Sequence, residues 1–206
     1  MKLSRVAALV LFAASAAPAF ASSFVVDFEH DWTYDSLVNS YYSGGTANDG
    51  SAGANLGVEF VNVAGLSNDP NFPSYYSGAP SPQGTAYVYT FGPEDRAYMN
   101  VAAGVAGGLS FYYSSPEDRI GAVKAYSGLN GTGTLLGSFD LTANSSSYDT
   151  WNDVTFKFGG LARSFDLTSA ANMVGFDNIS AVPEPGMLAM LLAGGIGLAA
   201  RARRRA

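Results

Sequence analysis

Few residues in this chain of 206 could carry out catalysis. Nucleophilic catalysis needs a base beside the nucleophile, and the sequence has one histidine, His30, and no cysteine. The tetrapeptide Pro-Glu-Asp-Arg occurs twice, at residues 93–96 and 116–119. A glycosidase would need two carboxyl groups facing one cleft. The simpler interpretation is that each tetrapeptide forms a type I turn, in which the arginine pairs with a nearby acid.

The aromatic residues favour a different chemistry, the binding of sugars. All twelve tyrosines and both tryptophans lie between residues 32 and 151. Exposed tyrosine and tryptophan rings can stack on the faces of sugars, so the candidate ligand-binding residues are Trp32, Tyr75, Tyr76 and Trp151. In an extended doublet such as Tyr75-Tyr76, the two rings point to opposite sides of the backbone. The alternative is that one ring of each doublet packs in the core and the other covers an edge.

These candidates need a scaffold, and the sequence predicts one made of strands. Short runs rich in Val, Phe, Tyr and Thr alternate with turns rich in Gly, Asn, Asp and Pro. The expected strands are residues 24–28, 58–63, 86–91, 109–113, 122–126, 134–139, 154–158 and 174–179. Gly159-Gly160 is expected to be a turn, and residues 39–55 and 68–83 to be long loops. The pattern predicts an all-β fold, an antiparallel, jelly-roll-like β-sandwich with almost no helix.

The N-terminus predicts export. Two cations, Lys2 and Arg5, precede an apolar run at residues 6–17, and the small-x-small pattern ends at Ala21. This is the pattern of a secretory signal peptide, residues 1–21, that is cleaved after Ala21. A permanent membrane helix is the less favoured alternative, because the run is short and is followed by Pro18.

The C-terminus has three ordered parts. Pro183, Glu184 and Pro185 are followed by fifteen uncharged residues, 186–200, and then by four arginines in the last six positions. A helix of fifteen residues spans only about 22 Å, against roughly 30 Å of hydrocarbon core. The segment therefore predicts a marginal transmembrane helix whose arginines stay on the cytoplasmic side. The alternative is a C-terminal helix buried in the protein.

This order of parts resembles the PEP-CTERM sorting signal of exopolysaccharide-producing Gram-negative bacteria. The resemblance covers residues 182–206, and Gly186 departs from the more usual Ser or Ala. It implies that an exosortase, a membrane-embedded transpeptidase-like protease, recognises Pro183, Glu184 and Pro185. It also implies transient insertion in the inner membrane, followed by delivery to the cell surface or extracellular matrix.

The expected body, residues 22–181, has a looser resemblance. Its segments 109–115, 123–133 and 175–179 are similar to the extracellular bodies of many PEP-CTERM proteins, which look like carbohydrate-binding jelly rolls. In such modules a structural Ca²⁺ joins the first strand to the last, so the resemblance implies that Asp27, Glu29 and Asp177 are calcium ligands. Carboxylate oxygens suit this ion, which needs six to eight ligands. The alternative is that Asp177 only makes hydrogen bonds to its neighbours.

The charge of the body excludes some partners. Residues 22–181 contain five Lys or Arg and sixteen Asp or Glu, a net charge near −11. Such a surface argues against nucleic acid and anionic lipid as partners. We therefore expect a non-enzymatic, exported protein that is a structural or carbohydrate-binding component of the exopolysaccharide. The alternative is a glycan-active hydrolase or lyase on the same scaffold, which would show a cleft with two convergent acids instead of exposed aromatic rings.

Overall fold

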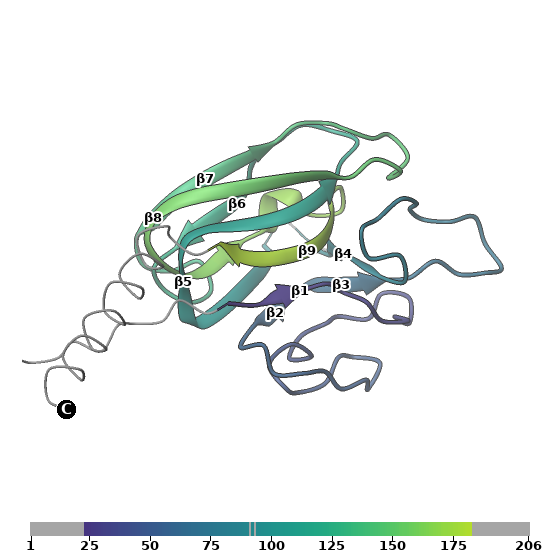
Figure 1. The fold of residues 1–206 in the computed structure, drawn as a ribbon, viewed down its shortest axis with the longest axis horizontal. Coiled ribbons are helices and arrows are strands. Elements are labelled where there is room, and N and C mark those ends of the chain that lie inside the picture. The colour runs from purple at the N-terminus through teal and green to yellow at the C-terminus, as the bar shows by residue number, and fades with distance from the viewer. Residues whose placement is uncertain (1–22, 91, 93, 183–206) are drawn as a thin grey trace, which may run out of the picture.

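The structure, a computed structural model, describes residues 23–90, 92 and 94–182 (Figure 1). Nine strands and one short 3₁₀-helix, η1, form in these ranges. In chain order they are β1 (Val25–Val26), β2 (Glu59–Val61), β3 (Val63–Leu66), β4 (Thr85–Val88), β5 (Tyr98–Ser114), β6 (Arg119–Tyr126), β7 (Leu135–Leu141), β8 (Asn152–Asp166), η1 (Thr168–Ala170) and β9 (Gly175–Val182). All pairings between these strands are antiparallel. The predicted all-β, antiparallel class is confirmed.

Two long strands, β5 and β8, run through both layers of the fold. The first part of β5 pairs with β2 and with the last part of β8, where Asn100 lies opposite Ser164. The last part of β5 pairs with the first part of β8 and with β9, where Ser114 lies opposite Gly175. The register shifts between the two parts, and Gly104 has a φ of +84° there. Such irregularities bend a strand pair, and here they turn it from one layer into the other.

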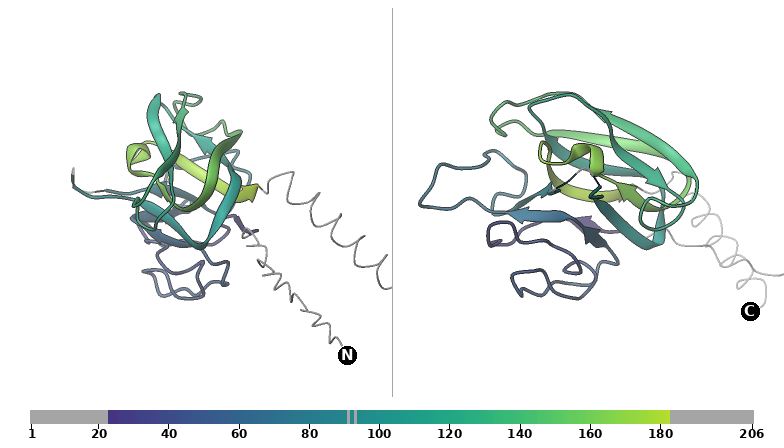
Figure 2. Two further views of the ribbon diagram at one scale, coloured as in Figure 1. Left: turned by 90° about the vertical axis from the view of Figure 1, so that its left-hand side faces the viewer. Right: turned by 180° about the vertical axis from the view of Figure 1, so that it is seen from behind.

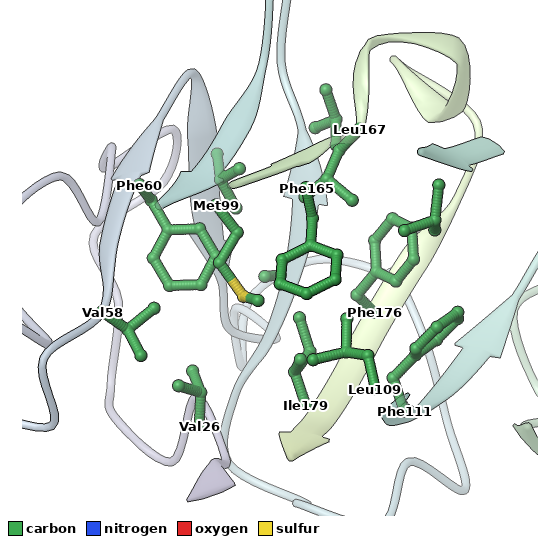
Figure 3. Close-up of a cluster of buried hydrophobic side chains, with 14 of the residues drawn as sticks. Val26, Val58, Phe60, Met99, Leu109, Phe111, Phe165, Leu167, Phe176 and Ile179 are labelled. Atoms are coloured by element: carbon green, nitrogen blue, oxygen red, sulfur yellow. The ribbon is translucent and has the colours of Figure 1, made fainter. Parts of the chain in front are cut away.

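The pairing divides the strands into two layers. One has the order β3-β4-β9-β5-β8, with β1 beside β9, and the other has the order β2-β5-β8-β6-β7. Seen from the end of the molecule, the strands wrap round a common interior (Figure 2). Figure 3 shows side chains from five strands meeting in it, Val26, Phe60, Met99, Phe165 and Ile179, each at most 2% exposed. Burying a side chain of this kind stabilises the fold by roughly 1.5–3 kcal/mol.

Each of the eight predicted runs overlaps a strand, and residues 39–55 and 68–83 are loops as predicted. The turn predicted at Gly159-Gly160 is wrong, because both residues lie inside β8. Gly160 has a φ of +84°, which lets the strand bend without leaving the sheet.

The predicted processing segments lie mostly outside the described residues. These are the signal peptide at residues 1–21, the motif Pro183, Glu184 and Pro185, and the helix that follows. Val182, which we assigned to the sorting signal, is the last residue of β9 and pairs with Gly108 of β5. Within the described ranges, no helix is both long enough and apolar enough to cross a membrane.

Candidate functional site

The floor of the candidate site is the outer face of one layer. Tyr87 of β4 lies between Ala64 of β3 and Gly175 of β9 in the pairing register. Directly paired residues point to the same face of a sheet, and the next residues along β4 and β9, Ala86 and Phe176, are buried in the core. Tyr87 and Gly175 therefore face away from the core, toward the loops that precede and follow these strands.

Above this floor is a cavity of about 350 Å³, which we call the aromatic cleft. Three loops, β4 and the segment just after β4 bring seven aromatic side chains to it: Tyr34, Tyr75, Tyr76, Tyr87, Tyr89, Tyr148 and Trp151. Two of the loops precede β2 and β4, and the third joins β7 to β8. Residues from distant parts of the sequence thus meet at one place on the sheet.

Trp151 is held in a defined position. Its Nε1 donates a hydrogen bond of 3.0 Å to the carbonyl oxygen of Ser77. Its ring meets that of Tyr76 edge to face, with centroids 6.2 Å apart, and lies against Gly175. The indole is therefore oriented by a hydrogen bond on one edge and by packing on the sheet.

Tyr34 and Tyr75 form the exposed part of the site. Their side chains are 63% and 39% exposed, their ring centroids are 5.8 Å apart, and their planes differ by 34°. These two rings also line a second cavity of about 430 Å³, together with Asp31, Asp69 and several polar residues. We call this second space the polar cavity. Two neighbouring exposed rings of this kind are able to stack on a flat apolar surface.

The hydroxyl of Tyr87 is held by the loop that precedes β2. This hydroxyl donates a hydrogen bond to Oδ1 of Asp35, and burial, followed by this bond to the carboxylate, raises the pKa of Tyr87 above its ordinary value. The phenol therefore stays protonated near neutral pH and acts as a donor.

The loop at residues 67–84 carries Tyr75 and Tyr76 and is anchored at three points. Oδ1 of Asn68 accepts hydrogen bonds from the backbone N–H groups of both tyrosines, at 2.8 and 3.3 Å, and its Nδ2 donates to the carbonyl of Tyr76. At its end, the backbone N–H of Ser81 donates to Asp177 at 2.7 Å, and that of Gln83 donates to Glu29 at 2.8 Å. The loop is thus tied to itself, to β9 and to the segment after β1.

Three of the four predicted ligand-binding residues, Tyr75, Tyr76 and Trp151, line the aromatic cleft. Within the doublet, Tyr75 is 39% exposed and Tyr76 only 4%, so Tyr76 is the buried ring, as the alternative for such doublets has it. Trp32 requires a correction. It borders the polar cavity, but its side chain is only 4% exposed, since the ring packs against Gly65 and Nε1 donates to the carbonyl of Phe28 at 2.8 Å. A buried ring cannot stack on a sugar, and the exposed aromatic ring next to Trp32 is that of Tyr34, which lines both cavities.

Two of the three predicted calcium ligands, Asp177 and Glu29, bind the anchored loop. The carboxylate of Asp177 is buried and accepts hydrogen bonds from the backbone N–H groups of Ser81 and Asn178, each at 2.7 Å. Burial raises the pKa of Asp177 to about 6, against the opposing effect of these bonds. Glu29 accepts from Gln83, and Asp27 accepts from the N–H of Glu29 at 3.3 Å.

This arrangement is an incomplete donor set for calcium. In the part of the chain that the structure describes, no three acidic or histidine side chains group closely enough to hold a metal ion. The hydrogen bonds of Asp177 also match the alternative that we gave for it. The calcium site remains a prediction from the sequence.

Comparisons with known proteins identify no family for this chain. No family model matches it, and no curated protein matches it. Among solved structures it is similar to the K2 cleaved adhesin domain of Lys-gingipain, with 14% identity over 78% of this chain and 99% of that one and a TM-score of 0.46. It is also similar to the K1 cleaved adhesin domain of Lys-gingipain from Porphyromonas gingivalis, with 15% identity over 79% of this chain and 98% of that one and a TM-score of 0.45. A family 6 carbohydrate-binding module is a third similar structure, with 17% identity over 61% of this chain and 86% of that one and a TM-score of 0.40.

The two Pro-Glu-Asp-Arg segments contribute no acid to the aromatic cleft. In the second, Arg119 pairs with Glu117 at 3.8 Å, and Asp118 accepts a hydrogen bond from the N–H of Ala143. In the first, Asp95 accepts from the N–H of Gly92. The contacts of Arg119 with Glu117 and of Asp95 with Gly92 are local, as the interpretation as turns requires, whereas that of Asp118 reaches 25 positions along the chain. The described residues that line the aromatic cleft include no carboxylate.

Proposed function

We propose that this protein is a non-catalytic carbohydrate-binding component of an extracellular polysaccharide matrix, on a jelly-roll-like scaffold. The observation that carries the proposal is the aromatic cleft, in which tyrosine and tryptophan rings from three loops surround a space of about 350 Å³. Sugars present apolar C–H faces that pack on aromatic rings, while their hydroxyls bond to nearby polar groups. The volume lies within the range of roughly 300–1,000 Å³ that is common for ligand pockets.

The cleft is suited to binding because its rings are already ordered. Trp151 is fixed by Ser77 and Gly175, and Tyr75 and Tyr76 by Asn68. A ligand that stacks on fixed rings loses less conformational entropy than one that must order them. The arrangement supports recognition of a ligand rather than chemistry on it, since the cleft offers aromatic surface and no pair of acids.

The test is glycan binding by wild type and by two variants, Trp151→Ala and Tyr75→Ala. A glycan array identifies the ligand, and calorimetric titration measures the affinity. Because aromatic anchors carry a large share of binding energy, we expect each variant to bind at least about tenfold more weakly. Ile120→Ala is the matched control, because this side chain in β6 is 78% exposed and lies outside the aromatic cleft. Equal affinity of wild type and Trp151→Ala would contradict the proposal.

We also propose that the protein reaches the matrix by exosortase sorting. In this proposal residues 1–21 direct export, residues 187–200 anchor the chain transiently in the inner membrane, and exosortase recognises Pro183, Glu184 and Pro185. The intact mass of the protein from the host's surface or medium tests it, with and without exosortase. We expect a form that begins at Ser22 and lacks the C-terminal arginines only when exosortase is present. A mature form that keeps Arg201 to Arg205 in both strains would exclude this route.

A further inference from the structure

Charge is unevenly distributed along this chain. Residues 23–95 contain nine Asp or Glu and no Lys or Arg. The five cations of the body come later: Arg96 precedes β5, Arg119 and Lys124 lie in β6, and Lys157 and Arg163 lie in β8. In the strand order, β3 and β4 lie at one end and β6 lies next to the other end, beyond β8. Four of the five cations are thus on β6 and β8, outside the floor strands β3, β4 and β9. Arg119 is the one that approaches the aromatic cleft, because its charge opposes the rise that burial causes in the pKa of Tyr148.

The aromatic cleft and the polar cavity adjoin. Tyr34 and Tyr75 line both, so this pair of rings forms a wall that the two spaces share. The spaces measure about 350 and 430 Å³. A ligand that lies across the two rings reaches both spaces, which together we call the groove.

The groove has negative charges and no positive one. Asp31 and Asp69 line the polar cavity, and Asp35 accepts a hydrogen bond from the hydroxyl of Tyr87, which lines the aromatic cleft. None of the described residues that line either space is a lysine or an arginine. Each of these carboxylates would repel a uronate or sulfate group in the groove. The repulsion is roughly 1 kcal/mol at 4 Å in water, and more where water is excluded. The hydroxyls of a neutral sugar, in contrast, can donate hydrogen bonds to these carboxylates.

We propose that the groove binds consecutive sugars of an uncharged polysaccharide chain and discriminates against anionic polysaccharides. The rings of Tyr34, Tyr75 and Trp151 stack on the sugars, while Asp31 and Asp69 accept bonds from hydroxyls of the next sugars along the chain. Discrimination comes from repulsion between the anionic sugar and these carboxylates, since no lysine or arginine is among the described residues that line the groove. This inference rests on the proposed carbohydrate binding.

The test compares one chain in a neutral and an anionic form. Neutral glucans, xylans and mannans are screened, and the tightest binder is selected. A fraction of its primary hydroxyls is then oxidised to carboxylates. If the tightest binder has no primary hydroxyl, a neutral glucan is oxidised instead. We expect the oxidised chain to bind at least about tenfold more weakly at 20 mM salt. The difference should shrink at 0.5 M salt, because exposed charges are then screened within roughly 4–5 Å.

Two variants assign the effect to the groove. Asp31→Asn should narrow the ratio between the affinities for the neutral and the oxidised chain by about threefold or more, since it removes one repelling charge. Glu59→Gln in β2 changes the net charge equally but lies outside both cavities, and should leave the ratio unchanged. If the oxidised chain binds wild type as tightly as the neutral chain or more tightly, and Trp151→Ala loses this binding, the discrimination inferred here is wrong. The proposed carbohydrate binding would still hold. Absence of binding to all neutral and anionic chains would overturn both.

Discussion

The indole ring of Trp151 lies against the backbone of Gly175. A β-carbon placed on Gly175 would come within 2.9 Å of Cη2 of the indole and 3.5 Å of Cζ3. Gly175 is the first residue of β9 and pairs with Tyr87 on one side and Ser114 on the other. The missing side chain in the middle of the sheet therefore sets how deeply the tryptophan sits in the aromatic cleft.

Substituting this glycine should affect binding more than folding. In Gly175→Ala the new methyl group must displace the ring of Trp151, and we expect affinity for the glycan to fall by about three- to tenfold, roughly 1 kcal/mol. Calorimetric titration measures this loss, and a shift of tryptophan emission reports the displaced ring. Gly159→Ala is the matched control, because a β-carbon there would meet nothing within 4 Å. Unchanged affinity and emission in Gly175→Ala would show that the position of Trp151 does not depend on Gly175.

Asn68 positions both tyrosines of its loop, and its side chain makes three hydrogen bonds to their backbone. Asn68→Ala removes these bonds and should reduce the free energy of unfolding by about 1–3 kcal/mol. Hydrogen exchange at the amides of Tyr75 and Tyr76 should become faster, and glycan affinity should fall.

Asn71→Ala is a suitable control for the loop. Asn71 lies in the same loop, and its backbone N–H and its Nδ2 both donate to Oδ1 of Asp69, two residues away. We expect its effect on the exchange of Tyr75 and Tyr76 to be small. A comparable effect of both variants would mean that the loop is held by something other than Asn68.

The strands were predictable where side chains alternate. In residues 154–158 Phe156 is buried while Thr155 and Lys157 are exposed, as a period of two requires. The first part of β5 was not predictable, because residues 101–108 are all Ala, Gly or Val, which match a turn or loop as well as a strand. It forms because Val105, Ala106 and Gly108 pair with β8, and such tertiary pairing overrides local propensity.

Residue type alone identified most of the candidate site but could not assemble it. Tyr75, Tyr76 and Trp151 could be chosen as aromatic residues in loops, whereas Tyr87 was assigned only to a strand. The site exists because β4 pairs with β9, whose residues are about ninety positions away in the chain, and no local pattern encodes this pairing. Trp32 was misplaced for a similar reason, because its burial depends on the close approach of the indole to Gly65.

Calcium dependence is decided by thermal unfolding in excess Ca²⁺ and in chelator. If the ion joins Asp27, Glu29 and Asp177 as the sequence predicts, binding should add about 2.7 kcal/mol to the free energy of unfolding at a hundredfold excess over Kd. Asp27→Asn should abolish the increase, and Mg²⁺ should not replace Ca²⁺, because it demands a smaller, octahedral site. An identical Tm in Ca²⁺ and chelator would refute the calcium prediction.

Asp177 should make the stability of the protein depend on pH. Burial raises its pKa from the ordinary 3.8 to about 6 in the folded state, with a further contribution from the charge of Glu29. Between these values the folded protein holds a proton that the unfolded chain has lost, so this group's contribution to stability falls as pH rises from about 4 to about 7. We expect a loss of about 1–3 kcal/mol from this group.

The loss is isolated by comparing wild type with Asp177→Asn at several pH values. The amide cannot ionise, so the variant should become more stable relative to wild type as pH rises from 4 to 7. Its altered hydrogen bond to Ser81 or Asn178 changes the free energy of unfolding by the same amount at every pH and does not affect this trend. Asp149→Asn is the control, because a hydrogen bond from the hydroxyl of Ser145 lowers the pKa of Asp149. The stabilisation of such a group is complete above the ordinary carboxyl pKa and is lost only as pH falls below about 4, so this variant should show no relative change between pH 5 and 7. Urea unfolding gives the free energies, and a constant difference between wild type and Asp177→Asn from pH 4 to 7 would mean that the carboxylate is already ionised across this range.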